Sequence, residues 1–489
     1  MFNFKNSFSK LPNDFFERIY PAPVKKPELI DINQDLANFL NLDPERMRGK
    51  EGSSVFAGNT IPKGSEPLAM VYAGHQFGHF VPKLGDGRAI LLGEILAKNG
   101  KRFDVQLKGS GKTSFSRNGD GRAPLGPILR EYIVSESMAH LKIPSTRVLS
   151  ISKTGEFVKR ESIVPGGILT RIASSHIRIG TFEYFANLKD YKSIKILADY
   201  TIKRHFPEIK EGKNKYLKLF KNVMLLQAKL VSSWMNVGFI HGVMNTDNTS
   251  ISGETIDYGP CAFMDFFNSK TVYSYIDTLG RYSYGNQPKV ILWNLSKFGE
   301  CIATLIDANM KNALKKINNI LEMFPEKFNN FLLKGIRNKM GLHQTHNKDN
   351  EIISSFFSLL EEENSDLTIC FRKLSDNLTK EGWDKEFLSN FKDKTKIKNW
   401  LNNWKKRVLK EKISPQQISK KMQRINPIYI ARNHLIEIAI KNIIDRNDYS
   451  DFKKLLSLIR TPYTEKEKSQ KYSIPPNPNE IVINTFCGT

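Results

Sequence analysis

The chain has 489 residues, and at roughly 100–200 residues per domain this length predicts two to four domains. Hydrophobic residues make up 40% of the sequence and aromatic residues 11%, so the chain can fill a core and general disorder is excluded. The formal net charge of +24 first suggests a nucleic-acid partner. Much of the excess, however, is lysine in the C-terminal half, mixed with Asn and Ile, which is typical of solvated helix faces. We therefore do not expect nucleic acid as the main partner.

The cysteines and the apolar runs exclude several further classes of protein. The four cysteines are too few and too scattered for a disulfide framework, and they lack the C-x-x-C spacing of a zinc site. They are Cys261, Cys301, Cys370 and Cys487. No run of about 18 apolar residues exists that could span a membrane. The first twenty residues contain no continuous apolar stretch and carry Asp14 and Glu17, which argues against a secretory signal. We expect a soluble cytoplasmic protein.

The first part of the chain reads as a small sheet with one helix inserted. Residues 1–60 are mixed, with a turn signal at 21–23 and a short helical pattern at 31–42. From about 86 to 175 short β-rich runs are bounded by Gly, Pro or Ser. We expect strands at 88–96, 102–109, 145–152, 156–163 and 166–173. A helix opening with Pro127 and ending near residue 141 separates the early strands from the late ones.

After about residue 180 the spacing of apolar residues changes from that of strands to that of helices. Residues 184–206 and 215–239 each predict one long amphipathic helix. A Gly- and Asn-rich stretch follows at 237–260, then helices to about 460, and the Pro/Asn-rich tail from 471 is expected to be extended. This order predicts an α+β protein with a β-rich lobe, a helical lobe and a cleft between them.

Glycine-rich loops and arginines gather in the β-rich part. The tetrapeptide Gly-Asp-Gly-Arg occurs at 85–88 and again at 119–122, and each copy could be a simple tight turn or could bring backbone N–H groups and a guanidinium to one phosphate. A third loop at 108–113 resembles a P-loop, but Gln106 stands where that motif needs Gly. The arginines of this region suit a phosphate-bearing ligand better than lysines would. They are Arg88, Arg102, Arg117, Arg122, Arg130, Arg147, Arg160, Arg171 and Arg178.

Lys108 ends a predicted strand, and Glu131 lies in the helix that follows. A strand lysine paired with a helix glutamate is the arrangement by which kinase-like lobes hold nucleotide phosphates. The alternative is a solvated lysine at a strand end. Only a structure can show whether the two side chains meet.

A second kinase-like pattern starts at His241. In the kinase catalytic loop an Asn falls seven residues after the His, and Asn248 has that spacing here. Asp257-Tyr258-Gly259 then stands where Asp-Phe-Gly would, and Asn248 and Asp257 supply oxygen ligands suited to Mg²⁺. The usual kinase base, two residues after the His, is replaced by Val243. The available carboxylate is Asp247.

With these residues assembled, the chain resembles the selenoprotein O family. The shared segments cover most of residues 10–300, and the C-terminal helices match less distinctively. They are Y-A-G-H-Q-F-G-H-F at 72–80, L-G-D-G-R at 84–88, L-K-G-S-G at 107–111, S-R-N-G-D-G-R-A at 116–123, L-R-E at 129–131, P-S-T-R at 144–147, H-G-V-M-N-T-D-N at 241–248, D-Y-G-P at 257–260 and R-Y-S-Y-G-N-Q-P at 281–288.

The resemblance implies a bilobal, protein-kinase-like pseudokinase fold that binds ATP in the reverse orientation. AMP would then be transferred from ATP to Ser, Thr or Tyr hydroxyls of protein substrates, with Mg²⁺ or Mn²⁺ as the metal. The implied parts are an N-terminal extension packed on the N-lobe (1–80), a nucleotide-binding N-lobe (81–178), a helical C-lobe with the catalytic and metal loops (179–460) and an extended tail (461–489).

The same resemblance implies a role for each matching residue. Asp247 would be the general base, and Asn248 and Asp257 would bind the metal. The implied nucleotide-binding residues are Gly85, Gly87 and Arg88 of the first loop, Lys108 with its supporting Glu131, Asp120 and Gly121 of the second loop, Arg171 and Arg178 at the outer phosphates, and Asp257. Lys112 and Thr113 receive no role.

Three alternative functions stay open at this point. The same site could transfer UMP from UTP with Mn²⁺, since base selectivity is not readable from sequence. A non-catalytic ATP-binding scaffold would not need Lys108, Asp247, Asn248 and Asp257 together. A nucleic-acid-binding protein would lose affinity steeply with salt.

Two smaller features give further expectations. Cys487 lies in the tail and Cys261 four residues after Asp257, so a regulatory disulfide between them is one hypothesis and two free thiols the other. His75 and His79 have helical spacing but stand among glycines and aromatic residues. We expect a loop or short turn there, with hydrogen-bonded structural roles rather than a metal site.

Overall fold

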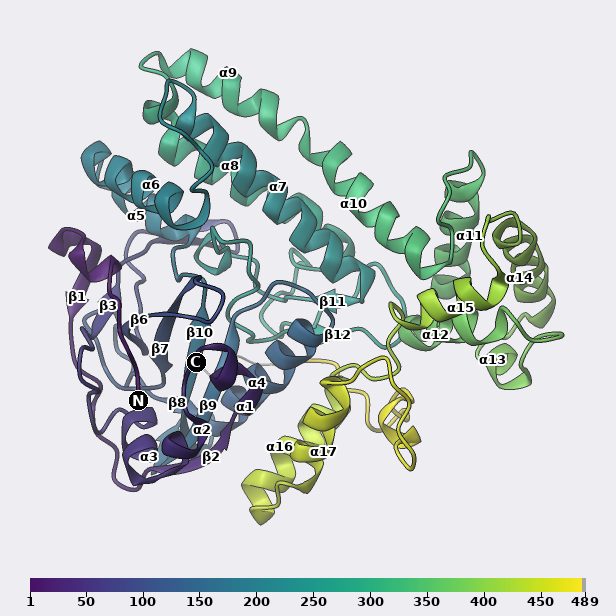
Figure 1. Cartoon of the computed structure of the whole chain (residues 1–489), viewed down its shortest axis with the longest axis horizontal. Helices are drawn as coiled ribbons and strands as arrows, with labels where there is room; N and C mark the ends of the chain where they lie inside the picture. Colours follow the sequence, from purple (N-terminus) through teal and green to yellow (C-terminus); the bar gives the residue numbers. More distant parts are fainter. Residues whose placement is uncertain (486–489) are drawn as a thin grey trace.

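The computed structural model describes residues 1–485, in which an antiparallel sheet is followed by a long succession of helices (Figure 1). The main sheet has eight strands in the order β1-β3-β6-β7-β10-β9-β2, with β8 pairing to β10. Its strands are β1 (Phe16–Arg18), β2 (Glu28–Ile32), β3 (Leu68–Met70), β6 (Ala89–Leu96), β7 (Arg102–Lys108), β8 (Ala123–Pro124), β9 (Arg147–Lys159) and β10 (Ile163–Ala173). The predicted α+β class is confirmed at this level.

The late strands are longer than the sequence predicts. The expected strands at 145–152 and 156–163 form one continuous strand, β9, and β10 begins at Ile163 and continues through the expected 166–173. Gly155 lies inside β9 with a φ of 70°, which lets the chain pass a short irregularity without ending the strand. The glycine that indicated a strand boundary therefore marks a distortion within one strand.

Helix α4 (Leu125–His140) lies across the sheet and is buried along nearly its whole length. It begins two residues before Pro127, because Pro124 takes the extended N-cap position and the first turn tolerates a proline nitrogen. Val134 and Leu129 belong to the core that the sheet and this helix share. The helix runs from β8 to the loop before β9, which places Glu131 over β7 and β10.

Residues 1–80 contribute directly to the sheet. β1 pairs with β3 at one edge, and β2 pairs with β9 at the other. Three short helices, α1 (Gln34–Phe39), α2 (Pro44–Arg48) and α3 (Lys50–Phe56), cover a second small core on this part of the sheet. β4 (Gly74–Gln76) and β5 (His79–Val81) form a separate hairpin.

The predicted long helix at 184–206 is wrong, because the chain breaks it in the middle. α5 (Ile179–Asn187) ends before Lys189, which has a φ of 55°, and α6 (Tyr191–His205) starts after Asp190. The Asp190 side chain accepts a hydrogen bond from the backbone N–H of Ser193 and caps the second helix. The expected helix from 215 is observed as α7 (Lys215–Asn236).

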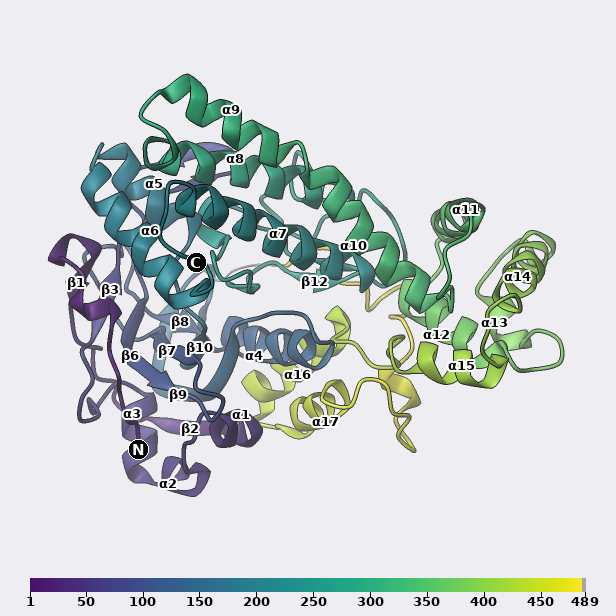
Figure 2. The same cartoon turned by 45° about the horizontal axis from the view of Figure 1, so that its top comes forward.

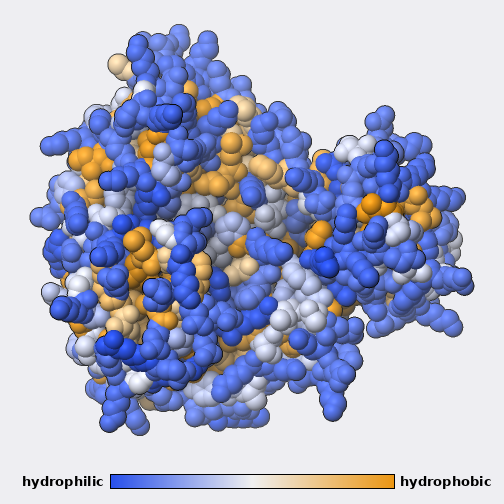
Figure 3. Space-filling model, viewed as in Figure 1, coloured by the Kyte–Doolittle hydropathy of each residue, from blue (hydrophilic) through white to orange (hydrophobic). Residues whose placement is uncertain are grey.

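Residues 237–286 contain no α-helix but include the two-stranded sheet of β11 (Phe239–Ile240) and β12 (Ala262–Phe263), so the helices expected after residue 260 start only at 287. From there helices follow one another up to Ile459, as predicted. They are α8 (Gln287–Ile306), α9 (Met310–Leu321), α10 (Phe324–Lys339), α11 (Asp349–Glu362), α12 (Leu367–Asn377), α13 (Lys385–Ser389), α14 (Lys394–Val408), α15 (Pro415–Gln423), α16 (Asn433–Arg446) and α17 (Ser450–Ile459). α11–α15 form a second core together with residues of the 240–284 segment and the end of α10, whereas α16 and α17 return to pack against α4 (Figure 2). Figure 3 shows a largely hydrophilic surface that is indented between the α11–α15 part and the main body. In residues 1–485 no helix is long and apolar enough to cross a membrane.

Candidate nucleotide-binding site

Asp257 lies at the centre of a cluster of three cationic side chains. Lys108 Nζ at the end of β7 donates to Asp257 Oδ1 at 3.0 Å, and Arg171 Nη2 in β10 donates to the same oxygen at 2.6 Å. Arg178 Nη1, at the N-cap of α5, donates to Oδ2 at 2.6 Å. Burial alone would raise the pKa of Asp257, but Arg171, Lys108 and Arg178 hold it well below its ordinary value. The Asp257 side chain keeps 21% of its surface exposed, so the cluster is reachable from solvent.

Glu131 forms the buried floor of this cluster. Its carboxylate accepts from Lys108 Nζ at 2.6 Å and from Arg171 Nη2 at 2.6 Å. The structure therefore brings together the strand lysine and the helix glutamate whose pairing the sequence left open. Burial opposes the charge of Glu131, yet Arg171 and Lys108 lower its pKa below the ordinary value. Glu131 and Asp257 share two cations, which holds those cations in place.

Asp247 lies beside the cluster on the short 3₁₀ turn Thr246–Asn248. Its side chain is buried, its Oδ1 has no hydrogen-bond partner, and its Oδ2 accepts only a long bond of 3.4 Å from Gln76. Burial raises the pKa of Asp247 to about 7. A Cβ on Gly74 would lie 2.5 Å from Asp247 Oδ1, so only glycine leaves room for the carboxylate there. The result is a buried carboxylate with a free oxygen, which is the chemistry of a base or a ligand.

Asn248 is held next to Asp247. Its Nδ2 donates to the Val243 carbonyl oxygen at 3.0 Å, which fixes the orientation of the side-chain amide. In residues 1–485 no group of three or more His, Cys, Asp or Glu side chains is placed to hold a metal ion. Asn248, Asp257 and the unpartnered Oδ1 of Asp247 nevertheless offer oxygen donors of the kind that Mg²⁺ prefers, so in chemistry they fit such an ion. In this structure both Asp257 oxygens are bonded to cationic side chains.

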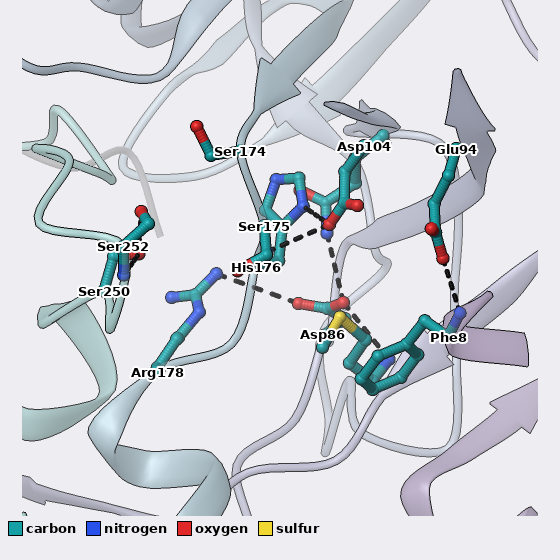
Figure 4. Close-up of polar contacts among 12 residues, drawn as sticks. Phe8, Asp86, Glu94, Asp104, Ser174, Ser175, His176, Arg178, Ser250 and Ser252 are labelled. Atoms are coloured by element: carbon teal, nitrogen blue, oxygen red, sulfur yellow. Dashed lines mark hydrogen bonds and ion pairs between the residues drawn. The ribbon is translucent and has the colours of Figure 1, made fainter. Parts of the chain in front are cut away.

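The first Gly-Asp-Gly-Arg loop contains a residue that the sequence analysis did not assign. Asp86 is 2% exposed, and its Oδ2 accepts from the Met70 backbone N–H and from Gln106 Nε2, each at 3.1 Å. Its Oδ1 lies 3.9 Å from Arg178 Nη2 (Figure 4). Burial raises the pKa of Asp86, and Arg178 opposes that shift. Asp86 thus lies directly behind an arginine of the Asp257 cluster.

The glycines of this loop are required by its packing. Gly85 has a φ of 72°, and a Cβ there would lie 2.3 Å from the Phe115 ring. A Cβ on Gly87 would lie 2.7 Å from the Phe115 carbonyl oxygen. Arg88 is half-buried at the start of β6, with its backbone carbonyl accepting from the Gly109 N–H at 2.6 Å. The loop is therefore a fixed support rather than a free flap.

A network of buried charged side chains lies beyond Asp86. His176 Nδ1 lies 2.9 Å from Asp104 Oδ2 (Figure 4). Arg204 Nη2 donates to Asp104 Oδ1 at 2.5 Å. Burial opposes ionisation, but Arg204 and His176 lower the pKa of Asp104 to about 2. Glu94 lies 3.2 Å from Arg204 and extends the network to the N-terminal segment. Nothing in the local sequence indicated this network, because its members come from four separate elements.

The second loop lies elsewhere. Asp120 binds Arg160 through two contacts of 2.9 Å, and this hydrogen bonding lowers its pKa. Gly121 has a φ of 69°, and a Cβ there would lie 2.1 Å from the Gly111 carbonyl oxygen. Arg122 donates to the Ala22 carbonyl oxygen at 3.1 Å. The structure therefore ties this loop to the glycine-rich loop and to the N-terminal segment, not to the Asp257 cluster.

Of the two histidines, His75 has the hydrogen-bonded role that was expected. His75 and His79 lie on the two strands of the β4–β5 hairpin, and His75 Nδ1 is 2.5 Å from Glu183 Oε1. Glu183 Oε2 also accepts from Thr246 Oγ1 at 2.5 Å, so this pair supports the turn that carries Asp247.

No helix follows Thr113, which agrees with the rejected P-loop interpretation. Cys261 is buried, and Cys487 lies outside the described residues.

Comparison with known proteins adds the family. The chain matches the family described as Protein adenylyltransferase SelO over residues 1–460. It is 48% identical to a Protein nucleotidyltransferase YdiU from Rhizobium etli over 488 residues, which is 100% of this chain and 97% of the relative. It is 49% identical to a protein of the same name from Rhodopseudomonas palustris, with 100% of this chain and 99% of the relative covered. The chain therefore belongs to the protein adenylyltransferase SelO family, a family of nucleotidyltransferase enzymes, as the resemblance of its motifs predicted.

Proposed function

We propose that this protein transfers AMP from ATP to Ser, Thr or Tyr hydroxyls of protein substrates, on a kinase-like bilobal fold and in the cytoplasm. The observation that carries the proposal is the group of three cations around Asp257 with a buried carboxylate, Asp247, beside it. Lysine and arginine side chains gathered in this way suit the binding of phosphate groups, and the carboxylate suits the need for a base. The family membership supports the same reaction.

The cationic side chains would bind the phosphates. Lys108, held by Glu131, would contact one phosphate, and Arg171 and Arg178 would hold the outer phosphates that leave as pyrophosphate. Gly85, Gly87 and Arg88 would contact the nucleotide from the first loop, and the second loop with Asp120 and Gly121 would close over it. Both loops have glycines where a side chain cannot fit, which lets the backbone approach a ligand closely.

Asp247 would accept the proton of the acceptor hydroxyl. The hydroxyl oxygen would then bond to the α-phosphorus while the bond from that phosphorus to the pyrophosphate oxygen breaks. Asn248 and Asp257 would hold Mg²⁺, or Mn²⁺ in its place, and the bound ion would neutralise phosphate charge. The unpartnered Oδ1 of Asp247 and the fixed amide of Asn248 support these assignments.

The experiment that tests the reaction uses ATP labelled on the α- or on the γ-phosphate. Label should reach protein only from the α position. Label from the γ position would identify an ordinary kinase, and no label from either position, with ATP still bound, would identify a scaffold. UTP labelled on the α-phosphate, offered with Mn²⁺, tests UMP transfer in the same assay. A steep loss of affinity for nucleic acid with rising salt would favour the nucleic-acid alternative.

Two variants test the site itself. Asp257→Ala should abolish transfer by removing a metal ligand while leaving the fold intact, and Asp247→Asn should abolish it by removing the base. Asp199→Asn is the matched control, because Asp199 lies on α6 and binds Lys195, Lys215 and Tyr216 at the surface. Wild-type turnover by Asp257→Ala with Mg²⁺ would show that the metal assignment is wrong.

A further inference from the structure

Two adjacent side chains of α4 bind two different parts of the molecule. Glu131 faces the cluster, where it binds Lys108 and Arg171. Arg130 is 3% exposed and points from the next position of the helix to the Cys261 carbonyl oxygen, to which its Nη1 donates at 3.2 Å. Cys261 lies four residues after Asp257. The same turn of α4 therefore contacts the phosphate-binding lysine and the segment that carries Asp257.

Helix α16 supplies the other partners of Arg130. Arg130 Nη1 donates to Asn433 Oδ1 at 2.8 Å, and its Nη2 binds the Glu437 carboxylate. Asn433 is the first residue of α16, and Glu437 follows one turn later on the same face. Figure 2 shows α16 and α17 lying along α4. The guanidinium of Arg130 thus joins α4, α16 and the Asp257 segment at one point.

The Asp257 segment is held at a second point by the same end of α16. Arg432, the N-cap residue, is fully buried and binds both Asp265 and Asp366. Its backbone also bridges to Phe263. The start of α16 therefore holds residues 263–265 through a backbone bridge and an ion pair, and Arg130 of α4 holds the Cys261 carbonyl oxygen. Such a segment has little freedom to move relative to α4.

We propose that Arg130 is a positioning residue, which with Asn433 and Glu437 of α16 sets the spacing between Glu131 and Asp257 around Lys108. Lys108 Nζ bonds to both carboxylates, at 2.6 Å and 3.0 Å, so a shift of either segment breaks one of the contacts. The proposal rests on the proposed transfer of AMP, in which Lys108 binds phosphate. A misplacement of about 1 Å at such a site costs on the order of 10²-fold in rate.

The test compares Arg130→Met with Arg460→Met. Arg460, between α17 and α4, donates to Glu136 at 3.2 Å and to the Tyr132 hydroxyl at 3.0 Å. It joins α4 to the same C-terminal helix pair, but its contacts do not reach the Asp257 segment. We expect Arg130→Met to lower kcat for transfer of the α-labelled phosphate about 10- to 100-fold, and Arg460→Met to lower it less than about threefold. The KM for ATP should change less than kcat in both variants.

A milder variant and a second measurement distinguish a loss of positioning from a loss of folding. Glu437→Gln keeps the shape of its side chain, half of which is exposed, and should lower kcat about threefold without lowering the unfolding temperature of the protein. Hydrogen exchange in the full chain should speed up over residues 257–266 in Arg130→Met and stay unchanged there in Arg460→Met.

The outcomes separate this proposal from the proposed function. Equal losses of kcat in Arg130→Met and Arg460→Met, or unchanged exchange over 257–266 in Arg130→Met, would overturn the positioning role. If the wild-type protein transfers no α-phosphate, the proposed function fails, and the exchange measurement still decides whether Arg130 fixes the Asp257 segment.

Discussion

The two Gly-Asp-Gly-Arg loops have identical sequences and different structures. In the loop at 85–88 the first glycine has the positive φ, 72°, and in the loop at 119–122 the second glycine has it, 69°. Asp86 is 2% exposed and faces Arg178 of the cluster. The Asp120 side chain is 44% exposed and binds Arg160. The tetrapeptide permits a turn, but the surrounding segments decide its shape and which partner its aspartate finds.

The two loops also differ in how they are anchored. The first loop packs on Phe115 and binds the backbone of β3 through Asp86, so it belongs to the core of the sheet. The second is anchored by hydrogen bonds between partly exposed groups, which water can replace at little cost. We therefore expect changes at Asp86 to act mainly on stability and changes at Asp120 to act mainly on nucleotide binding.

Asp86→Ala should have the largest effect on stability. It leaves the Met70 N–H and Gln106 Nε2 without their buried acceptor and removes the carboxylate behind Arg178. We expect the free energy of unfolding to fall by about 2–3 kcal/mol. Urea unfolding followed by circular dichroism measures it, and a loss below about 1 kcal/mol would remove the distinction between the loops.

The arginine next to each loop gives the second contrast. Arg178→Ala should weaken ATP binding by about one to two decades and ADP binding less, because charged hydrogen bonds to the outer phosphates are worth roughly 1.5–3 kcal/mol. Arg160→Ala, at the second loop, should weaken ATP binding less than about threefold. Titration calorimetry with both nucleotides checks this. Equal weakening of ATP and ADP by Arg178→Ala would place Arg178 away from the outer phosphates.

Asp120→Ala, unlike Asp86→Ala, should change nucleotide binding and leave stability nearly unchanged. Its exposed contacts with Arg160 contribute no more than about 1 kcal/mol, so the unfolding free energy should hardly change. The KM for ATP should rise about threefold, because a loosened loop must be ordered when the nucleotide binds. A KM equal to that of the wild type would show that the second loop takes no part in binding.

The two aspartates should also respond to pH with opposite signs. The pKa of Asp86 is raised by burial, so the wild type should lose stability relative to Asp86→Asn as pH rises from 3.8 to the raised pKa. The pKa of Asp120 is lowered by its hydrogen bonds to Arg160, so the wild type should lose stability relative to Asp120→Asn as pH falls below 3.8. Unfolding midpoints of the three proteins across this range measure both trends.

Much of the architecture was predictable from local patterns. The β-rich half, the buried helix α4 and the succession of helices to Ile459 follow from periodicity, which reports the face that each segment buries. The break between α5 and α6 was missed because it depends on the left-handed backbone of Lys189 and on the Asp190 cap, and neither interrupts the spacing of the apolar residues. The two predicted strands joined in β9 were separated by a glycine that the sheet absorbs.

The site was predictable where a motif has fixed spacing and not where partners are distant. Lys108, Glu131, Asp247 and Asp257 were named from such spacings, and the structure places Lys108 and Glu131 against Asp257. Asp86 was missed because an aspartate in a tight turn is common. Arg130 is separated from its partners by 131 and 303 residues, and no local signal reports such a contact.

The order of strands in the main sheet has a consequence for how the chain is made. Residues 1–32 supply the outermost strand on both sides of the sheet, β1 and β2. Glu28 pairs with Lys153, so at roughly 5–20 residues per second β2 leaves the ribosome about 6–25 seconds before its neighbour does. During that interval the nascent chain carries an unpaired strand, a natural binding site for a chaperone. A tag that hinders the N-terminus would therefore disturb both borders of the sheet at once, while a C-terminal tag would leave them intact.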